Sequence, residues 1–273
     1  MGKLRLLRVP SSMTTAFIIL GALILLFILV PLIKMVFSSS PGTLFSTLTE
    51  NDVWTSILLT IYAGLLATIA GLILGVPLAY LLARREFRGK RLLEGLIDVP
   101  IVIPHSAAGI ALLFVFGESF FLGRVFDSLG IGFVDTVAGV VIAMMFVSIP
   151  FLIDSAKEGF KAVDPRLEKV SRTLGASSWQ SFFRVSLPLA WRSIFAGSVM
   201  MWARGMSEFG AVLIIAYHVP FLGYHPTVAP ILVADRFESF GLDYARPVAV
   251  LIVLICLVAF IVLRTIAYRG KKA

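Results

Sequence analysis

The chain has 273 residues, of which 59% are hydrophobic and only 15% are charged. An average soluble domain is about half apolar and about a quarter charged, so this composition excludes an ordinary soluble domain and a disordered chain. The single cysteine excludes a disulfide framework and a cysteine-based zinc site. The net charge of +8 would suit a nucleic-acid-binding protein, so the positions of the basic residues decide what it means.

Six long apolar runs with few or no charged residues follow one another along the chain. A membrane-spanning helix needs about 20 predominantly apolar residues. A buried core helix would explain any one run, but too little polar chain remains to cover six. We therefore predict an all-α, polytopic membrane helical bundle that forms a single domain over residues 1–273. The six predicted transmembrane spans cover residues 13–37, 57–83, 97–117, 136–155, 193–217 and 246–265.

The first run also has the basic flank of a secretory signal peptide, in Lys3, Arg5 and Arg8. Its apolar part is longer than the roughly 7–15 residues usual in such a peptide. No clear small-residue cleavage site follows it. We interpret the run as a retained helix, with a cleaved signal peptide as the alternative.

The basic residues predict an orientation in the membrane. Of the 24 Lys and Arg residues, 19 lie in four segments: the two termini and the loops that follow the second and fourth spans. Six alternating spans place these segments on one side, which the positive-inside rule makes cytoplasmic. Both termini are then cytoplasmic, the protein is a multi-pass protein of the cell membrane, and no nucleic-acid partner is needed.

Small residues recur every four positions along the second span, so they form one stripe on a helix. Such stripes let two helix backbones approach closely within lipid. We therefore predict helix packing at this stripe, with a pore-lining role as the alternative. Its members are Ala63, Ala67, Gly71, Gly75 and Ala79.

The third span contains Pro100 and Pro104, each of which removes a backbone donor and disturbs the preceding turn. Carbonyl groups freed at membrane depth must be satisfied by protein or by a water-filled cavity. The segment is therefore a kink in the bundle or part of a pathway wall. We interpret His105 as a hydrogen-bonded residue near the kink, and we predict no metal site because no second ligand lies at a suitable spacing.

The loop over residues 157–190 is long and polar for a connection between spans. Asp164 is a favourable N-cap and Pro165 suits the first position of a short helix. Gly175 can end that helix with a left-handed residue. The sequence therefore predicts a short amphipathic helix that projects into the cytoplasm, followed by a second one capped by Ser177 or Ser178.

An isolated helix of about ten residues is marginal in water, so its apolar side needs a partner surface. We predict that this helix docks onto a cytoplasmic partner; the alternative is that the loop folds back onto its own bundle. The apolar side consists of Leu167, Val170 and Leu174, and the residues off that side are Glu168, Lys169 and Arg172.

This loop resembles the signature loop of the permease subunits of bacterial and archaeal ABC importers. That signature is Glu-Ala-Ala, three residues, Gly, nine residues and then Ile-x-Leu-Pro. Gly175 and, after nine intervening residues, the run Val185-Ser-Leu187-Pro188 match its second half. The first half departs, because Lys169, Val170 and Ser171 occupy the Glu-Ala-Ala positions and Glu168 lies one place earlier.

The resemblance implies that this loop is a coupling helix, which inserts into a cleft of a separate ATPase subunit. It also implies a homodimer of this chain, two ATP-binding cassette subunits and a periplasmic or extracellular oxyanion-binding protein, besides membrane lipid. The candidate coupling residues are Asp164, Pro165, Leu167, Glu168, Lys169, Val170, Arg172, Gly175, Ala176, Leu187 and Pro188.

Within that family, residues 203–211 resemble the molybdate, tungstate and sulfate permeases. Residues 216–218 and 234–247 look most like the archaeal-type tungstate/molybdate branch. The resemblance therefore implies import of molybdate or tungstate by alternating access, with sulfate or thiosulfate as the second possibility.

Arg204 and Glu208 are four residues apart, which would place them on one face of the fifth span. Arg204 is 12 residues beyond Arg192, about 18 Å along a helix and so well inside the hydrocarbon layer. Charges at this depth are expensive and mark functional sites. The pair can be a structural or gating ion pair, a direct oxyanion contact or a contact with a partner subunit. The pathway or gate candidates are Arg204, Ser207, Glu208, Pro100 and Pro104.

No Gly-x4-Gly-Lys-Ser/Thr phosphate loop occurs in the sequence, so we expect the chain not to be an enzyme and to bind no cofactor itself. ATP and Mg would be used by the partner subunit. An ion-coupled secondary transporter is the rival class, with Glu208 and His105 as its titratable groups inside spans. An intramembrane enzyme is a weaker rival, because His105-Ser106 has no evident acidic partner.

Overall fold

The computed structural model describes residues 11–269, and these residues are helical apart from short loops. Within that range there is no strand, and a single isolated bridge pairs Phe221 with Tyr224. The all-α fold class is therefore confirmed. Several basic residues used in the orientation argument lie outside the described range, namely Lys3, Arg5, Arg8, Lys271 and Lys272.

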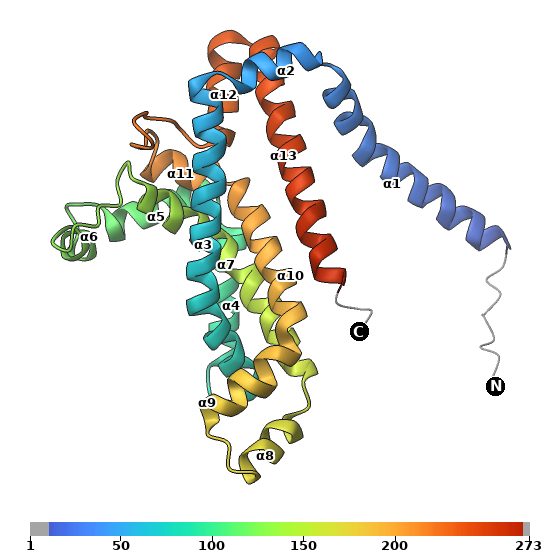
Figure 1. The fold of residues 1–273 in the computed structure, drawn as a ribbon, viewed down its shortest axis with the longest axis vertical. Helices are drawn as coiled ribbons and strands as arrows, with labels where there is room; N and C mark the ends of the chain where they lie inside the picture. The colour runs from blue at the N-terminus through green and yellow to red at the C-terminus, as the bar shows by residue number, and fades with distance from the viewer. Residues whose placement is uncertain (1–10, 270–273) are drawn as a thin grey trace.

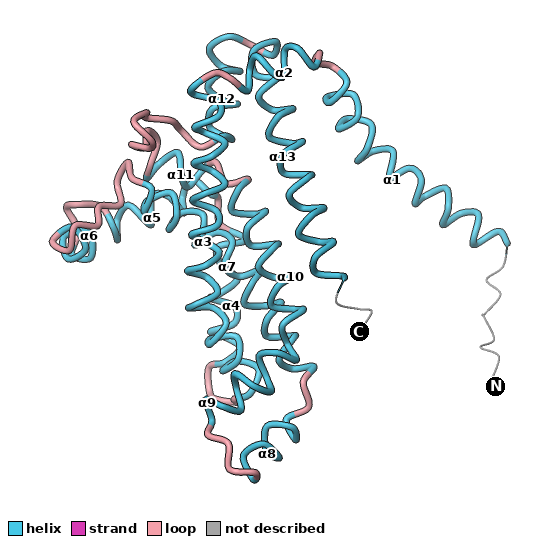
Figure 2. The backbone as a smooth tube through the Cα atoms, viewed as in Figure 1, coloured by secondary structure: helices cyan, strands magenta, loops and turns pink. Residues whose placement is uncertain are grey.

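The helices form an elongated bundle, with α8 at one end of its long axis and α2 and α12 at the other (Figure 1). Figure 2 shows that the loops gather at the two ends and on one flank. In chain order the elements are α1 (Ser11–Phe37), α2 (Pro41–Leu48), α3 (Asn51–Arg84), α4 (Lys90–Val102), α5 (His105–Phe116), α6 (Phe121–Asp127), α7 (Val137–Ala162), α8 (Pro165–Thr173), α9 (Ser178–Ser181), the π-helical turn η1 (Phe182–Ser186), α10 (Leu187–Met206), α11 (Gly210–Ile215), α12 (Ala229–Phe240) and α13 (Leu242–Arg269).

Four of the described helices, α1, α3, α7 and α13, are long and apolar enough to cross a membrane. Helices α4 and α5 are long and apolar enough only when they are taken together, and their axes are bent by 114° relative to each other. Helix α10 is not among the four, since it carries Arg192 and Arg204. The described chain thus contains four or five apolar spans, where the sequence predicts six.

The predicted span over residues 97–117 is broken into α4 and α5. Pro104 lies at the break, and it restricts Ile103 to an extended backbone with ψ of 147°. Pro100 lies inside α4, which continues past it to Val102. Of the two prolines, only Pro104 therefore coincides with the bend.

The predicted span over residues 193–217 is not one helix either. Helix α10 ends at Met206 and α11 starts at Gly210, so Glu208 lies in the break between them. Arg204 and Glu208 are consequently not two residues of one helical face, contrary to the sequence prediction. Arg204, Ser207, Glu208 and Gly210 gather at this break, but apolarity averaged over about 20 residues does not reveal it.

Helices α3, α7 and α10 form the centre of the bundle and lie side by side in Figure 1. The small-residue stripe of α3 is buried between the other two helices. A Cβ atom at Gly71 would lie 2.5 Å from Met201 of α10, and one at Gly75 would lie 3.3 Å from Ile153 of α7. On α10, a Cβ atom at Gly197 would lie 3.2 Å from the backbone of Leu152. Missing side chains thus let α7 approach α3 at Gly75 and α10 at Gly197, whereas Gly71 faces the flexible end of Met201.

Helix α1 stands apart from this bundle (Figure 1). None of the residues in its most apolar 18-residue window is buried within the chain. The end of α1 nearest the bundle is linked to α13. Arg246 of α13 donates a hydrogen bond of 3.4 Å to the carbonyl oxygen of Ser38, the residue after α1. The side chains of α1 are therefore available to lipid or to another protein.

Candidate functional site

Helix α8 forms an end of the bundle, and its own sequence fixes where it begins and ends (Figure 1). The Asp164 carboxylate accepts a 2.9 Å hydrogen bond from the backbone N–H of Arg166, and Pro165 occupies the first turn. The chain leaves the helix through Gly175, whose φ of +92° suits glycine. Ser177 and Gln180 then form a capping box that starts α9.

One side of α8 is apolar and uncovered. Leu167 is 46% exposed, Val170 is 55% exposed and Leu174 is 82% exposed. These positions are three and four residues apart, so they share one helical face. Nothing in the described chain covers this face. The alternative to docking, in which the loop folds back and buries its apolar side against the bundle, is therefore not observed.

The opposite side of α8 is fastened to the bundle through the carboxylate of Glu168. This carboxylate accepts hydrogen bonds from Arg84 Nε at 2.8 Å, from the Tyr80 hydroxyl at 2.9 Å and from the Ser186 hydroxyl at 2.7 Å. Arg84 also donates to the carbonyl oxygen of Val163, just before α8, at 3.0 Å. Both charged side chains are mostly buried, with 11% of Arg84 and 15% of Glu168 exposed.

Burial alone would raise the pKa of Glu168, but the hydrogen bonds from Ser186, Arg84 and Tyr80 outweigh it and hold the pKa below its ordinary value. The carboxylate is therefore charged at neutral pH and joins the end of α3, the start of α8 and the π turn η1. We call this set of four residues, Tyr80, Arg84, Glu168 and Ser186, the Glu168 clamp.

The remaining residues of the predicted coupling loop lie around the clamp. Lys169 and Arg172 are exposed on α8, and the backbone N–H of Ala176 donates to the carbonyl oxygen of Ser171 at 3.1 Å. Leu187 and Pro188 form the first turn of α10, directly after η1. The structure therefore brings both halves of the signature segment together at one end of the bundle.

The second group of predicted residues lies where two helices are interrupted. Glu208, in the break between α10 and α11, is 1% exposed. Its carboxylate lies 2.9 Å from Arg204 Nη2 and 3.0 Å from His105 Nδ1, and it accepts a 2.9 Å hydrogen bond from the backbone N–H of Ala211. His105 is the first residue of α5, so the two helix breaks meet at one carboxylate.

The imidazole of His105 also lies against the guanidinium of Arg204, with 2.9 Å between Arg204 Nη2 and His105 Nε2. Arg204 Nη2 also lies 3.0 Å from His105 Nδ1, so the guanidinium faces both ring nitrogens. Ser207 accepts a 3.2 Å hydrogen bond from Arg204 Nη1. Arg204 keeps 24% of its side chain exposed beside this group, which we call the elbow cluster: His105, Arg204, Ser207 and Glu208.

Two glycines let α5 and α11 approach closely next to the elbow cluster. A Cβ atom at Gly109 would lie 2.8 Å from the carbonyl oxygen of Ala211. One at Gly210 would lie 2.8 Å from Cβ of His105 and 3.0 Å from the backbone nitrogen of Ser106. Because these neighbours include backbone atoms, the contact cannot relax by rotating a side chain, and the two short helices pack as one unit.

A further charged group joins α4 to α7, and the sequence interpretation did not identify it. Lys157 Nζ lies 2.8 Å from Asp154 and 3.5 Å from Glu94. Asp98 lies nearby with one buried carboxylate oxygen that has no hydrogen-bond partner in the described chain. The signal was available as Asp98 and Asp154 within apolar runs, but only the packing of α4 on α7 brings them together.

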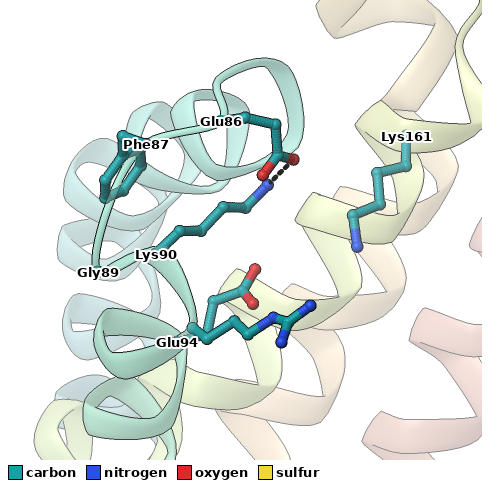
Figure 3. Close-up of a pocket in the computed structure, with 7 residues that line it drawn as sticks. Glu86, Phe87, Gly89, Lys90, Glu94 and Lys161 are labelled. Atoms are coloured by element: carbon teal, nitrogen blue, oxygen red, sulfur yellow. Dashed lines mark hydrogen bonds and ion pairs between the residues drawn. The ribbon is translucent and has the colours of Figure 1, made fainter.

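Next to this group is a hollow of about 430 Å³ between the α3–α4 loop and the end of α7 (Figure 3). Lys90 points toward Glu86, and their charged atoms are 2.6 Å apart. Lys161 faces the hollow from α7 and pairs with Glu158 at 2.9 Å. Two acidic and three basic side chains line the hollow, so most of their charges cancel one another.

The fold and these sites define an integral membrane protein of the permease class. The chain belongs to the family described as "Binding-protein-dependent transport system inner membrane component", whose family model matches residues 71–270. This family comprises the membrane subunits of ABC importers.

Named relatives point to the same family. The chain is 42% identical over 260 residues to "Molybdate/tungstate transport system permease protein WtpB" of Pyrococcus furiosus. The matched region covers 94% of this chain and 96% of the relative. It is 34% identical to "Probable sulfate transport system permease protein cysT" of Chlorokybus atmophyticus, over 72% of this chain and 68% of the relative.

A solved structure shows the same fold. A chain of a bacterial ABC transporter involved in the import of the acidic polysaccharide alginate matches with a TM-score of 0.73 and 14% identity, covering 96% of this chain and 97% of that chain. At this identity the likeness concerns the arrangement of the helices alone.

Replacing Glu168 by Gln should loosen α8, because Arg84 loses its carboxylate partner. Hydrogen bonds to charged groups contribute about 1.5–3 kcal/mol each, so we expect a clear loss of stability. Trypsin should cut faster after Arg166 and Lys169 in Glu168→Gln than in the unchanged chain. Glu158→Gln is the matched control, since it removes a carboxylate from an exposed pair that contributes about 0.2–1 kcal/mol.

The pH dependence of this effect follows from the lowered pKa of Glu168. A carboxyl whose folded pKa lies below its unfolded value stabilises the fold above the unfolded pKa, here the ordinary 4.5, and the stabilisation is lost as the pH falls through the folded value. The difference in thermal midpoint between the unchanged chain and Glu168→Gln should therefore be full at pH 7 and shrink as the pH falls below 4.5. A difference that stays constant over this range would contradict the assignment.

Proposed function

We propose that this chain is the permease subunit of an ATP-driven importer that moves molybdate or tungstate across the cytoplasmic membrane. The observation that carries the proposal is the 42% identity, over 94% of the chain, to a relative named as a molybdate/tungstate transport permease. The elbow cluster supports it, because a partly exposed guanidinium at a helix break suits an anion pathway.

The energy would come from a separate ATP-binding subunit that grips α8. The uncovered apolar face of α8 is the surface such a partner would bury. The Glu168 clamp would then pass the movement of α8 to α3 and α10, because its hydrogen bonds join these elements. In this scheme ATP and Mg are bound by the partner, and this chain supplies the mechanical connection.

The pathway would lie between two copies of this chain. Six spans are proposed for each copy: α1, α3, the bent α4–α5 pair, α7, α10 and α13. The uncovered surface of α1 supports a neighbour, since none of its most apolar window is buried within the chain. Two ATP-binding subunits and one oxyanion-binding protein would complete the assembly.

The proposed orientation places α8 and both termini in the cytoplasm. It rests on the basic residues near α8 and on the acidic residues at the far end of the bundle, where Glu50 and Asp52 pair with Arg236 of α12. The binding protein would deliver its oxyanion to that far end. Alternating access then requires that ATP binding and release favour two arrangements of the same packed helices.

We propose the elbow cluster as part of the gate. A buried carboxylate with three partners holds both helix breaks in one arrangement, and the exposed part of Arg204 offers positive charge beside it. Glu208 neutralises Arg204 and so prevents tight retention of a divalent oxyanion. Transport requires the pathway to bind the anion weakly, because the anion must leave the pathway after it has entered.

Sulfate is the second candidate cargo. The 34% identity to a probable sulfate transport permease favours it, but over a smaller share of the chain. Sulfate has the same charge and the same tetrahedral shape as molybdate, so the permease pathway discriminates poorly between them. The choice of cargo would therefore lie mainly in the binding protein.

Purification with the subunits encoded beside it tests the proposed cargo. The complex, reconstituted in vesicles with its binding protein, should hydrolyse ATP faster with molybdate or tungstate than with sulfate, and should accumulate the same anions. Uptake that follows an imposed ion gradient without ATP would contradict the proposal and indicate a secondary transporter. A preference for sulfate would retain the importer and replace its cargo.

Replacing Val170 by Glu should prevent docking of the ATP-binding subunit. Val170 is 55% exposed at the centre of the apolar face, and a charge there would have to lose its water inside the proposed cleft. We expect co-purification of the ATPase to fall at least tenfold, with an unchanged thermal midpoint of the permease alone. Ser178→Glu, at the exposed start of α9 and away from the apolar face of α8, should keep its partner; equal loss in both variants would argue against docking through this face.

The elbow cluster predicts a specific pattern of uptake in single and double variants. Arg204→Ala removes the guanidinium from the buried Glu208, and Glu208→Ala removes the carboxylate from Arg204, whose side chain is 24% exposed; removing one partner of a buried pair costs about 3–5 kcal/mol. Each should therefore lose most uptake, while the double variant should recover thermal stability relative to Glu208→Ala. Normal uptake in all three variants would exclude a gating role for the pair.

A further inference from the structure

A groove of about 550 Å³ lies between the end of α3 and the segment that carries α8 and α9. Pro77, Leu81 and Trp179 give it apolar walls. Glu168 is its single acidic lining residue, against four basic ones. The basic lining residues are Arg84, Arg85, Lys169 and Arg172.

Three of these basic residues have no partner in the part of the chain that the structure describes. Arg84 is held by Glu168, but Arg85, Lys169 and Arg172 are exposed and form no ion pair or side-chain hydrogen bond within residues 11–269. Lys169 and Arg172 are three residues apart, so they project on the same side of α8. The groove therefore combines an apolar interior with an uncompensated positive rim, which complements an anion that carries an apolar chain.

An exposed apolar strip on α3 leads directly into this groove. Leu65 is 47% exposed, Ile69 is 53% exposed and Ile73 is 66% exposed. The next positions at the same spacing of four are Pro77 and Leu81, which line the groove itself. A hydrocarbon chain that lies along α3 would thus end with its polar head beside the basic rim.

Trp179 stands at the mouth of the groove with 73% of its surface exposed, stacked on Phe183 at 5.9 Å between ring centroids. Exposed tryptophans are enriched where membrane hydrocarbon meets the headgroups. Packing within the chain does not explain why so large an apolar side chain is exposed, whereas a position at the membrane boundary does.

Docking of a partner on α8 would leave the groove accessible. The groove is lined by Pro165, Glu168, Lys169 and Arg172, which share one side of the helix. The uncovered apolar face contains Leu167, two residues from Lys169 and therefore on the other side. The two surfaces of α8 can thus be occupied at the same time.

We propose that this groove binds an anionic phospholipid of the cytoplasmic leaflet. Its phosphate would lie among Arg85, Lys169 and Arg172, and one acyl chain would follow the exposed strip of α3. The proposal rests on the proposed function for its orientation, which places this end of α3 at the cytoplasmic leaflet, where anionic lipids are common. A lipid held there would touch both α3 and α8.

Fluorescence quenching of the full chain in nanodiscs tests this proposal without ATP or transport. Phosphatidylglycerol and phosphatidylcholine with brominated acyl chains are compared on a variant whose Trp54, Trp191 and Trp202 are replaced by Phe. Trp179 should be quenched at a much lower fraction of brominated phosphatidylglycerol than of brominated phosphatidylcholine. This preference should fall about 30-fold in Arg85→Gln/Arg172→Gln, because each basic residue near an anionic headgroup contributes about 1 kcal/mol and each 1.4 kcal/mol is tenfold.

A variant with the same loss of charge serves as the control. Arg88→Gln/Arg166→Gln removes two arginines from the same two segments, but neither of them lines the groove, so its preference should stay within about twofold of the parent. If the single-tryptophan variant does not fold, phospholipid that stays bound to the otherwise unchanged chain after detergent washing is identified by mass spectrometry, with the same two pairs of variants.

Three outcomes would overturn the proposal. Equal quenching by both lipids would mean a lipid boundary without headgroup selection. Displacement of phosphatidylglycerol by millimolar inorganic phosphate would indicate a site for a free oxyanion. Quenching by neither lipid, with Trp179 shielded by a second copy of the chain, would assign the groove to a protein partner. Since uptake is not measured, failure of the proposed transport function would leave these readouts intact.

Discussion

The absence of side chains along the contacts of α3, α7 and α10 is the constraint on which the rest of the structure depends. In lipid, apolar side chains gain little by leaving the hydrocarbon, so helices associate through close contact and not through the hydrophobic effect. Gly71, Gly75 and Gly197 provide that contact at the centre of the bundle. The three helices consequently behave as one packed block, and the functional segments lie at the block's end and at its broken helices.

Two charged groups lie where helices of this block stop, and each has a partner distant in the sequence. Glu168 meets Arg84, 84 positions earlier, and Glu208 meets His105 across the two helix breaks. Such groups would be costly in a membrane bundle if they were unpaired. Their pairing fixes how the ends of helices sit against one another, which the apolar contacts between helices leave open.

Much of the architecture was predictable from local sequence signals. The runs of apolar residues predict α1, α3, α7 and α13, because a span is a property of composition over about 20 residues. The caps of α8 were predictable for the same local reason, since Asp164 and Gly175 act on backbone atoms within a few residues.

The breaks and long-range contacts were not predictable in this way. The break at residues 207–209 coincides with Ser207, Glu208 and the following Gly210, but residues of these types also occur in unbroken spans, and Pro104 lies at the corresponding break in the other span. In the sequence, Arg84 is one of several basic residues after the second predicted span. No neighbouring residue identifies Arg84, rather than another of these, as the partner of Glu168. The break at residues 207–209 and the Arg84–Glu168 contact both depend on how α3, α7 and α10 pack. A single sequence does not specify this packing.

The π turn η1 has a consequence for how this region can vary. A π turn accommodates one residue more than an α-helical turn, and here it lies between α9 and α10 within one continuous helical path. Deleting a single residue from 182–186 would restore α-helical winding and rotate everything before it by about 100° about the axis of α10. Ser186 would then turn away from Glu168. Geometry therefore constrains the length of this segment, so the connection should tolerate exchange of side chains far better than gain or loss of a residue, unlike ordinary surface loops.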